Sequence, residues 1–383
     1  MIKKEKVIIT FFLPSLECGG TERNTVNLLK NLNKENYALS LLLAEKKGDF
    51  IKDVPKEIPI VSFNAHSLFK IFLHLIAYFK EEKADIFVSA FPRFNAIVLL
   101  AKKFSGTKTK IIITEHLSFS LLSKTAKTVS HRFIARFLFP SFIKLFYPNA
   151  DAIICVSKGI AQEISSMAGH LEKIKVIYNP VADHTILEKA KAEVSHTWFH
   201  STEIPVILMV GRLSKTKDQP TLFRALSIIL KKQPAHLVIV GDGTEKLKLI
   251  NLATQLNLTE NIAFLGFQDN PYKYMKRASV FVLSSLQEGF GNVIVEAMAC
   301  GTPVVATNCA SGPSEIIQDR INGLLVAPQN EEALASLIIK VLNNPSLAKT
   351  LSIEGKKRSE FFSIKKSVEE YEKIFQTISL TIK

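Results

Sequence analysis

Cysteine is scarce in this sequence of 383 residues, and its four cysteines stand far apart. Cys18, Cys155, Cys300 and Cys309 form no Cys-x-x-Cys pair. Without paired or regularly spaced cysteines, we expect neither a structural zinc site nor the disulfide framework of a small secreted domain. This usage fits a reducing compartment, and we predict a cytoplasmic protein.

Long hydrophobic runs are missing as well. The longest candidate, 68–80, is interrupted by Lys70 and His74, whereas a helix that spans a bilayer needs about 20 predominantly apolar residues. The N-terminus imitates a lipoprotein signal, but Glu17 precedes the cysteine where such a signal requires a small residue. We interpret 7–13 as a buried strand of a parallel sheet, and we do not expect an integral membrane protein.

Acidic residues are outnumbered: 35 Asp and Glu stand against 49 Lys and Arg, with a formal net charge of +14. An excess of this size suits nucleic acid, an anionic membrane surface or phosphorylated substrates. Zinc-finger and RNP motifs are absent, and the cations are not gathered in arginine-rich runs among aromatic residues. We therefore expect no nucleic-acid partner.

The sequence does contain a regular alternation of short apolar runs with segments of helical periodicity. This alternation is typical of the α/β class, in which helices cover both faces of an open, mostly parallel sheet. The runs predicted as strands are 7–13, 37–44, 59–63, 85–90, 110–115, 151–157, 175–180, 205–212, 236–243, 262–267, 280–285, 302–307 and 322–327.

A polar, irregularly patterned stretch at 181–204, which holds the only tryptophan, interrupts this alternation. At roughly 150 residues per domain, the length also indicates two or three domains. We predict an N-terminal domain over 1–182 and a C-terminal domain over 203–362, joined near 182–202. The amphipathic segment 363–378 predicts a last helix. Because ligands bind at the carboxyl ends of parallel strands, a cleft between the domains is the expected site.

The loop "CGGTER" (18–23) follows the first predicted strand and precedes a helix. Gly19 and Gly20 allow the backbone to approach a ligand, and the helix N-terminus after them favours an anion. A plain tight turn is an equally good interpretation. The loop is not a Gly-x-Gly-x-x-Gly fingerprint, so it gives little support to NAD binding.

Two further loops follow predicted strands of the second half. In "VGRLSKTKD" (210–218), Arg212 can bind phosphate oxygens in a bidentate manner, and Lys217 adds a point charge. Two solvated surface cations are an equally common explanation. The loop "VGDGTEKLK" (240–248), which contains Gly241, is expected to be a structural turn that lines the cleft.

The stretch "EGFGNVIVE" begins at Glu288 and ends at Glu296. It predicts a glycine-rich turn after a buried strand and then a helix over 292–300, ended by Gly301 and Pro303. In the turn, Gly289 and Gly291 free the backbone, so that amides near Asn292 and Val293 can face an anion. Glu296 lies in a helix that is apolar almost all round, where a carboxylate is costly unless it is paired or bound.

Together these motifs resemble those of the retaining glycosyltransferases of family 4, over essentially the whole chain. Glu288 and Glu296 match the E-x7-E motif of the family, and "AMACGTPVVAT" follows it. "VGRLSKTKD", "CGGTER", "TEH" (114–116) and "NGLLVAP" extend the match in family order. The resemblance implies the GT-B fold, an α/β architecture of two facing Rossmann-like, doubly wound domains with a cleft between them. It also implies that 363–383 packs back on the first domain.

The resemblance assigns roles to individual residues. Arg212 and Lys217 would hold the donor diphosphate and stabilise the leaving group, and Glu288 would touch the donor sugar. Glu296 would accept hydrogen bonds from the ribose hydroxyls, and His116 would lie beside the transferred sugar. Glu288, His116, Arg212 and Lys217 are thus the expected catalytic residues. The other residues expected to bind substrate are Gly19, Gly20, Gly241, Gly289, Phe290, Gly291, Asn292 and Val293.

The implied reaction transfers a sugar from a nucleotide-diphospho-sugar, expected to be a UDP-sugar, with retention of configuration. The acceptor would be a bacterial surface polysaccharide or a polyprenyl-linked or lipopolysaccharide-type saccharide. No metal or other cofactor is expected, and the sequence agrees, since it has no Asp-x-Asp cluster for magnesium. Asn292 stands where family members often have leucine, which leaves the sugar preference open.

The stretch 121–148 is basic and rich in phenylalanine, and it contains no acidic residue. Its cations are Lys124, Lys127, Arg132, Arg136 and Lys144. Such a stretch is typical of a segment that lies on an anionic membrane surface; a domain helix with a basic face is the alternative. We predict peripheral association with the cytoplasmic face of the inner membrane.

Three other functions compete with this one. An enzyme of the same fold could act on a soluble acceptor, as sucrose and glycogen synthases do. An inactive sugar-nucleotide-binding protein is disfavoured by the complete set of charged residues. An NAD-dependent epimerase or dehydrogenase lacks its glycine fingerprint, and its Tyr-x-x-x-Lys spacing, present at Tyr272 and Lys276, falls in the wrong place.

Overall fold

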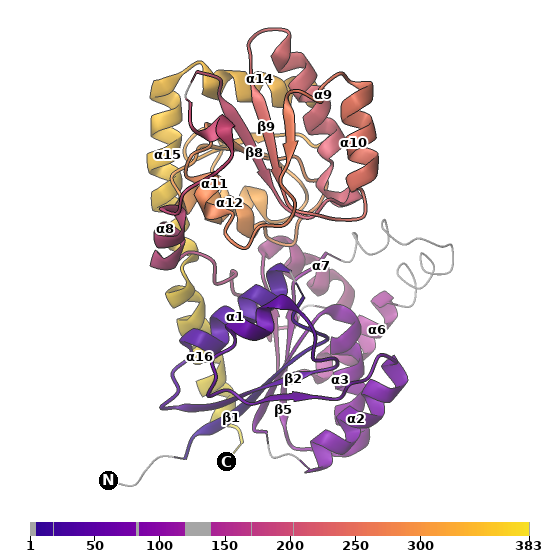
Figure 1. Ribbon diagram of the computed structural model, residues 1–383. Helices are drawn as coiled ribbons and strands as arrows, with labels where there is room; N and C mark the ends of the chain where they lie inside the picture. The colour runs from indigo at the N-terminus through magenta and orange to yellow at the C-terminus, as the bar shows by residue number, and fades with distance from the viewer. Residues whose placement is uncertain are drawn as a thin grey trace. The chain divides into compact units, whose positions relative to one another are not determined.

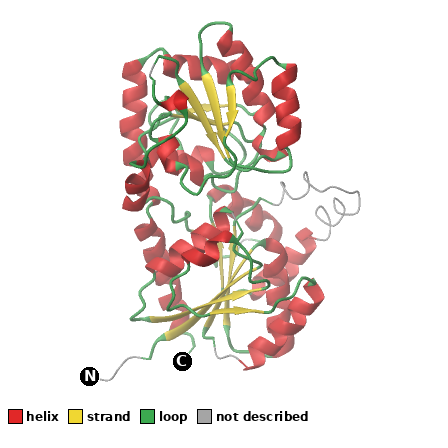
Figure 2. Cartoon of the chain, viewed as in Figure 1, coloured by secondary structure: helices red, strands yellow, loops and turns green. Residues whose placement is uncertain are grey.

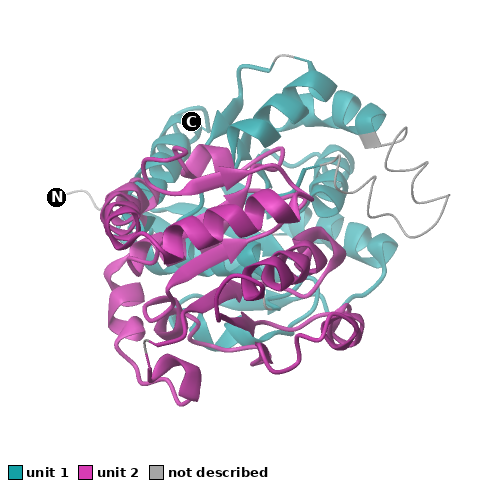
Figure 3. Ribbon diagram, turned by 90° about the horizontal axis from the view of Figure 1, so that it is seen from above, with its two compact units in different colours: residues 1–180, 364–383 teal, residues 181–363 magenta. Residues whose placement is uncertain are grey.

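The computed structural model describes residues 5–17, 19–81, 84–118, 139–169, 171–201 and 203–382. The chain divides into two compact units, shown in Figure 3: unit 1 comprises Met1–Pro180 and Ile364–Lys383, and unit 2 comprises Val181–Ser363. In each unit, helices cover both faces of a parallel sheet (Figures 1 and 2). The prediction of two doubly wound α/β sheets is confirmed.

The sheet of unit 1 has seven strands in the order β3-β2-β1-β4-β5-β6-β7. Their apolar sequences follow from burial on both faces, which is the usual environment of a parallel strand. The order reverses between β1 and β4, and ligands bind at such a point in open α/β sheets. The strands are β1 (Val7–Leu13), β2 (Tyr37–Leu43), β3 (Ile60–Ser62), β4 (Ile86–Ala90), β5 (Lys110–Glu115), β6 (Ala152–Cys155) and β7 (Ile174–Val176).

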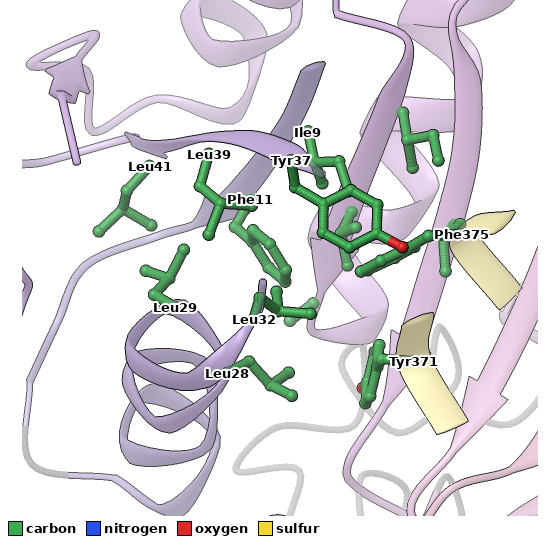
Figure 4. Close-up of a cluster of buried hydrophobic side chains, with 14 of the residues drawn as sticks. Ile9, Phe11, Leu28, Leu29, Leu32, Tyr37, Leu39, Leu41, Tyr371 and Phe375 are labelled. Carbon is green, nitrogen blue, oxygen red and sulfur yellow. The ribbon is translucent and has the colours of Figure 1, made fainter. Parts of the chain in front are cut away.

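Alternate residues of β1 face two different layers of helices. Phe11 contacts Phe375 of α16, with ring centroids 6.4 Å apart, whereas Phe12 contacts Phe94 of α3 at 5.8 Å. Figure 4 shows the first layer, where Tyr371 and Phe375 lie among the leucines of α1 and the strands. The helices are α1 (Gly20–Asn31), α2 (Leu68–Glu81), α3 (Pro92–Ser105), α6 (Phe139–Phe146), α7 (Lys158–Ala168) and α16 (Ile364–Ser379), with 3-10 turns at Asp49–Asp53 and Tyr147–Asn149.

Unit 2 has a six-stranded parallel sheet in the order β10-β9-β8-β11-β12-β13, which reverses between β8 and β11. Its strands are β8 (Val206–Val210), β9 (His236–Val240), β10 (Ile262–Phe264), β11 (Val280–Leu283), β12 (Val304–Thr307) and β13 (Leu324–Val326). Its helices are α8 (His184–Ala190), α9 (Gln219–Leu230), α10 (Lys246–Gln255), α11 (Tyr272–Met275), α12 (Asn292–Ala299), α13 (Pro313–Ile316), α14 (Glu331–Leu342) and α15 (Pro345–Ser359), with 3-10 turns at Thr197–Phe199, Lys215–Lys217 and Glu360–Phe362.

Residues 181–201, within the region expected to join the domains, belong to unit 2. Asp183 caps α8 by accepting from the backbone amides of Thr185 and Ile186, and α8 packs against α11. Farther along, the Trp198 ring stacks on His236 of β9 with centroids 3.8 Å apart and an interplanar angle of 3°. Side-chain packing therefore fixes a segment whose sequence shows no regular period.

The predicted membrane-surface stretch 121–148 lies partly outside the described residues, since nothing is described between 118 and 139. Of its five cations, only Lys144 is described; it lies exposed on α6. Among the helices of the described ranges, none is both long and apolar enough to cross a membrane.

Candidate functional site

Glu288 lies in the turn between β11 and α12, at the carboxyl edge of the unit 2 sheet. Its Oε1 accepts a hydrogen bond from Ser285 Oγ at 2.6 Å and lies 2.5 Å from Lys217 Nζ. Ser311 Oγ donates to the Glu288 carbonyl oxygen at 2.5 Å. Both charged side chains are shielded from water, with 18% of Lys217 and 10% of Glu288 exposed. These contacts tie the turn to Lys217, Ser285 and Ser311.

Lys217 ends the 3-10 turn after β8, and two bonds tie this turn to the end of β11. Ser284 Oγ donates to the Lys217 carbonyl at 2.8 Å, and the Leu286 amide donates to the Thr216 carbonyl at 2.8 Å. The two loops thus meet at the point where the strand order of unit 2 reverses. Arg212, in the same loop as Lys217, is exposed. The structure brings Lys217 and Glu288 together as a pair, which the sequence analysis did not foresee.

The glycine turn leads directly into α12. Gly291 is the residue before the helix, and its φ of 101° lies in the region that favours glycine. The helix begins at Asn292, shortly after Glu288 in the chain, so the N-terminus of α12 lies at the same sheet edge as the Lys217–Glu288 pair. A helix N-terminus carries partial positive charge and suits an anion. Phe290 is buried, with its ring 5.3 Å from that of Phe362.

Glu296 lies in α12 and is 4% exposed. The Tyr272 hydroxyl, from α11, donates to its Oε1 at 3.5 Å. Tyr272 entered the sequence analysis only as half of a Tyr-x-x-x-Lys spacing, and its contact with Glu296 was missed. Pairing of this kind is what a carboxylate in an apolar helix requires. Ser285 and Ser311 were missed as well, since serines near a turn carry no distinctive pattern.

Gly241 has a structural reason to be glycine. Its φ is 138°, and a Cβ built on it would lie 2.0 Å from the Gly211 carbonyl oxygen. The loops after β8 and β9 therefore touch backbone to backbone at this point. Its predicted contact with the donor stays a prediction.

His116 follows β5 directly in unit 1 and is 9% exposed. Its Nε2 lies 3.1 Å from Thr114 Oγ1, and burial lowers the pKa of the imidazole to about 4. The ring is therefore neutral at pH 7. It lines a pocket within unit 1 together with Asn24 and Thr25 of α1 and Tyr178 and Asn179. Neutral His116 can exchange hydrogen bonds with a ligand there, but it supplies no charge.

Glu115, next to His116, is fully buried and was not singled out from the sequence. Its Oε1 accepts from Tyr147 Oη at 2.5 Å and from Asn95 Nδ2 at 2.7 Å. Burial raises the pKa of the carboxyl to about 8, although both hydrogen bonds act in the opposite direction. Glu115 is thus protonated over most of the neutral range and fixes the end of β5 before His116.

Gly19 precedes α1, which begins at Gly20. The predicted phosphate contact at this helix end has a competitor, because Glu22 lies in the first turn and its carboxylate reaches the space beside Gly19. A phosphate bound here would have to share the helix end with that carboxylate. Cys18 lies outside the described residues.

No group of three or more His, Cys, Asp or Glu side chains placed to hold a metal ion occurs in the described part of the chain. That finding concerns resident ligands alone. The expected independence of the reaction from metals stays a prediction.

Comparisons with known proteins agree with this arrangement. Residues 18–184 match the family described as "Glycosyltransferase Family 4", and residues 191–358 match "Glycosyl transferases group 1". A relative from Campylobacter jejuni, N-acetylgalactosamine-N,N'-diacetylbacillosaminyl-diphospho-undecaprenol 4-alpha-N-acetylgalactosaminyltransferase, is 32% identical over 92% of this chain and 94% of its own. The lipopolysaccharide core biosynthesis glycosyltransferase LpsE of Rhizobium meliloti is 32% identical over 55% of this chain and 59% of its own.

Solved structures resemble both units. A glycosyltransferase from Rickettsia africae matches with a TM-score of 0.79 and 22% identity over 97% of this chain and 98% of its own. HepE from Anabaena in complex with UDP matches with a TM-score of 0.75 and 21% identity over 97% and 100% of the two chains. These likenesses show the GT-B fold. The family matches and the Campylobacter relative show that the chain is a glycosyltransferase and belongs to family 4.

Proposed function

We propose that this enzyme moves a sugar from a UDP-sugar to a polyprenyl-diphosphate-linked saccharide during assembly of a bacterial surface glycan. It does so with retention of configuration and without a metal. The observation that carries the proposal is the shielded Lys217–Glu288 pair at the sheet edge where α12 begins. The names of two relatives, an undecaprenol-diphosphate-dependent transferase and a lipopolysaccharide core transferase, support the acceptor class. The UDP complex of HepE supports the nucleotide.

The donor would bind at the carboxyl edge of the unit 2 sheet. Its diphosphate accepts hydrogen bonds from Lys217 and Arg212 and from the first amides of α12, because each of these presents positive charge or N–H donors at the same edge. Glu296 accepts from the ribose hydroxyls, and Glu288 meets a hydroxyl of the sugar. When the diphosphate arrives, Lys217 shares its charge between the phosphate and Glu288.

Transfer requires no ionised protein base in this scheme. The bond between the sugar C1 and the donor phosphate oxygen breaks as the acceptor hydroxyl oxygen forms a bond to C1 on the same face. The hydroxyl proton passes to the departing phosphate oxygen. Lys217 and Arg212 stabilise the negative charge that develops on the diphosphate, so catalysis rests on positioning and electrostatics. His116, neutral at pH 7, orients a hydroxyl of the transferred sugar.

A soluble acceptor is the main alternative. Sucrose-phosphate synthase from Thermosynechococcus elongatus matches with a TM-score of 0.82, but at 19% identity this likeness shows the fold alone. A screen of nucleotide sugars, each offered with an undecaprenyl-diphosphate saccharide and with a soluble sugar, separates the two. We expect one UDP-sugar to be consumed with the lipid-linked acceptor. Turnover only with soluble sugars would contradict the acceptor, and preference for another nucleotide would contradict the donor.

A further inference from the structure

Three helices of unit 1, α2, α3 and α6, form a continuous layer, since α2 packs on α3 and α3 packs on α6; Figure 1 shows them along one side of this unit. A helix that covers a sheet buries one apolar stripe and normally presents polar residues to water. The buried stripe of α2 is Ile71, Leu75 and Phe79. Its outer side departs from the rule, because Phe69 is 68% exposed and Leu73 is 49% exposed.

The two helices that adjoin α2 in this layer also expose large apolar side chains. On α3, Phe104 is 65% exposed, and its ring meets that of Phe72 on α2 edge-on with centroids 5.8 Å apart. On α6, Leu145 is 66% exposed. Single exposed apolar residues are ordinary, but large ones gathered over adjoining helices mark an interaction surface.

The charges on the same three helices are almost all of one sign. Their sequences contain one acidic residue, Glu81. Five cations on them are exposed: Lys70, Lys80, Arg93, Lys103 and Lys144. A second copy of this face would be repelled by like charges, and protein interfaces are depleted in lysine. Large apolar side chains among lysines instead suit the boundary between anionic headgroups and acyl chains.

We infer that the outer surface of α2, α3 and α6 is the site at which this protein docks on an anionic lipid bilayer. The α2–α3–α6 face, as we name it, consists of Leu68, Phe69, Leu73, Phe104 and Leu145 with the five exposed cations. The apolar side chains enter the headgroup region, and the cations contact lipid phosphates. The inference deepens the proposed function, since it would bring the enzyme to the surface that holds a lipid-linked acceptor. Docking itself needs neither donor nor acceptor.

Vesicle flotation tests the inference without any sugar substrate. We expect the wild-type chain to bind mixed vesicles of phosphatidylcholine and phosphatidylglycerol roughly tenfold more tightly than vesicles of phosphatidylcholine alone. The reason is that the anionic lipid attracts the exposed cations of the α2–α3–α6 face. The double variant Phe69→Gln/Leu145→Gln should lose most of this binding. Its matched control is Leu247→Gln on α10 of unit 2, where the side chain is 76% exposed. Lys70→Glu/Lys144→Glu, with Lys340→Glu as control, should lose the preference for anionic lipid.

Several results would overturn the inference. The wild-type chain could bind neutral and anionic vesicles equally or not at all, or the face variants could bind as tightly as their controls. Loss of binding after reversal of Lys124 and Lys127, with the face variants unaffected, would place docking elsewhere. Turnover with a short-chain, water-soluble acceptor should be equal in Phe69→Gln/Leu145→Gln and wild type. That readout separates failure of docking from failure of the proposed function, and circular dichroism checks folding.

Discussion

The Glu115 carboxyl and the His116 imidazole are neighbours in sequence. Burial raises the pKa of Glu115 and lowers the pKa of His116, so it favours the neutral form of each. For Glu115 the folded value of about 8 lies above the ordinary 4.5, so the folded state retains a proton that the unfolded chain loses between these values. Its stabilising effect is complete below pH 4.5 and disappears as the pH rises through 8. For His116 the folded value of about 4 lies below 6.5, so its effect is complete above pH 6.5 and is lost toward pH 4.

Between pH 4.5 and 6.5 the two groups change the free energy of unfolding in opposite directions. Between pH 6.5 and 8 only Glu115 changes it. In that window we expect its contribution to the free energy of unfolding to fall by up to about 1.4 kcal/mol per pH unit. Glu115→Gln keeps an acceptor for Tyr147 but cannot ionise, so this fall should be absent from the variant. Urea unfolding of both proteins at several pH values measures it. Parallel curves for the two proteins would contradict the assignment of a protonated Glu115.

At the scale of elements, the strands were predictable because parallel strands are buried on both faces and stand out as short apolar runs. The helix after Glu288 was predictable too, from Gly291 before it and Gly301 beyond it. The contact partners of individual side chains were not predictable, since periodicity indicates which residues are buried but not which residues they contact. Glu296 was expected to need a partner, yet nothing in the sequence pointed to Tyr272. The segment around Trp198 shows no regular period in its sequence. The stack of Trp198 on His236, which orders this segment, therefore could not be predicted.

Trp198→Ala tests how far this stack secures the start of unit 2. Loss of an aromatic pair and of part of its buried area should lower the free energy of unfolding of this unit by about 1–3 kcal/mol. Trp198→Phe retains an aromatic ring on His236 and should recover most of the difference. Urea unfolding followed by circular dichroism measures the three proteins. Equal stability of the alanine variant and wild type would show that the stack contributes little.

At the scale of the whole molecule, each unit has its own set of polar or charged residues at the carboxyl edge of a doubly wound sheet. Unit 1 supplies neutral His116 and its pocket, and unit 2 supplies Lys217, Glu288 and the N-terminus of α12. The fold and the set of loops could be inferred from sequence. The ion pair within that set could not, because Lys217 and Glu288 come from loops far apart in the chain.

Metal removal is a test of the complete enzyme. If cations of the chain stabilise the leaving diphosphate, turnover should be largely unchanged after dialysis against EDTA. The rate before and after dialysis, and after readdition of magnesium, measures this. A rate that vanishes with EDTA and returns with magnesium would contradict the metal-free reaction, although it would leave the fold and the family untouched.

The central claim is that Lys217 stabilises the developing charge on the donor diphosphate. The most direct measurement is kcat for Lys217→Ala, with Lys215→Ala as the matched control, since Lys215 is an exposed lysine of the same 3-10 turn. We expect kcat of Lys217→Ala to fall about 100- to 1,000-fold, the usual effect of removing a charge-stabilising group, while Lys215→Ala stays close to wild type. Full turnover by a folded Lys217→Ala enzyme, or equal losses in both variants, would contradict the account.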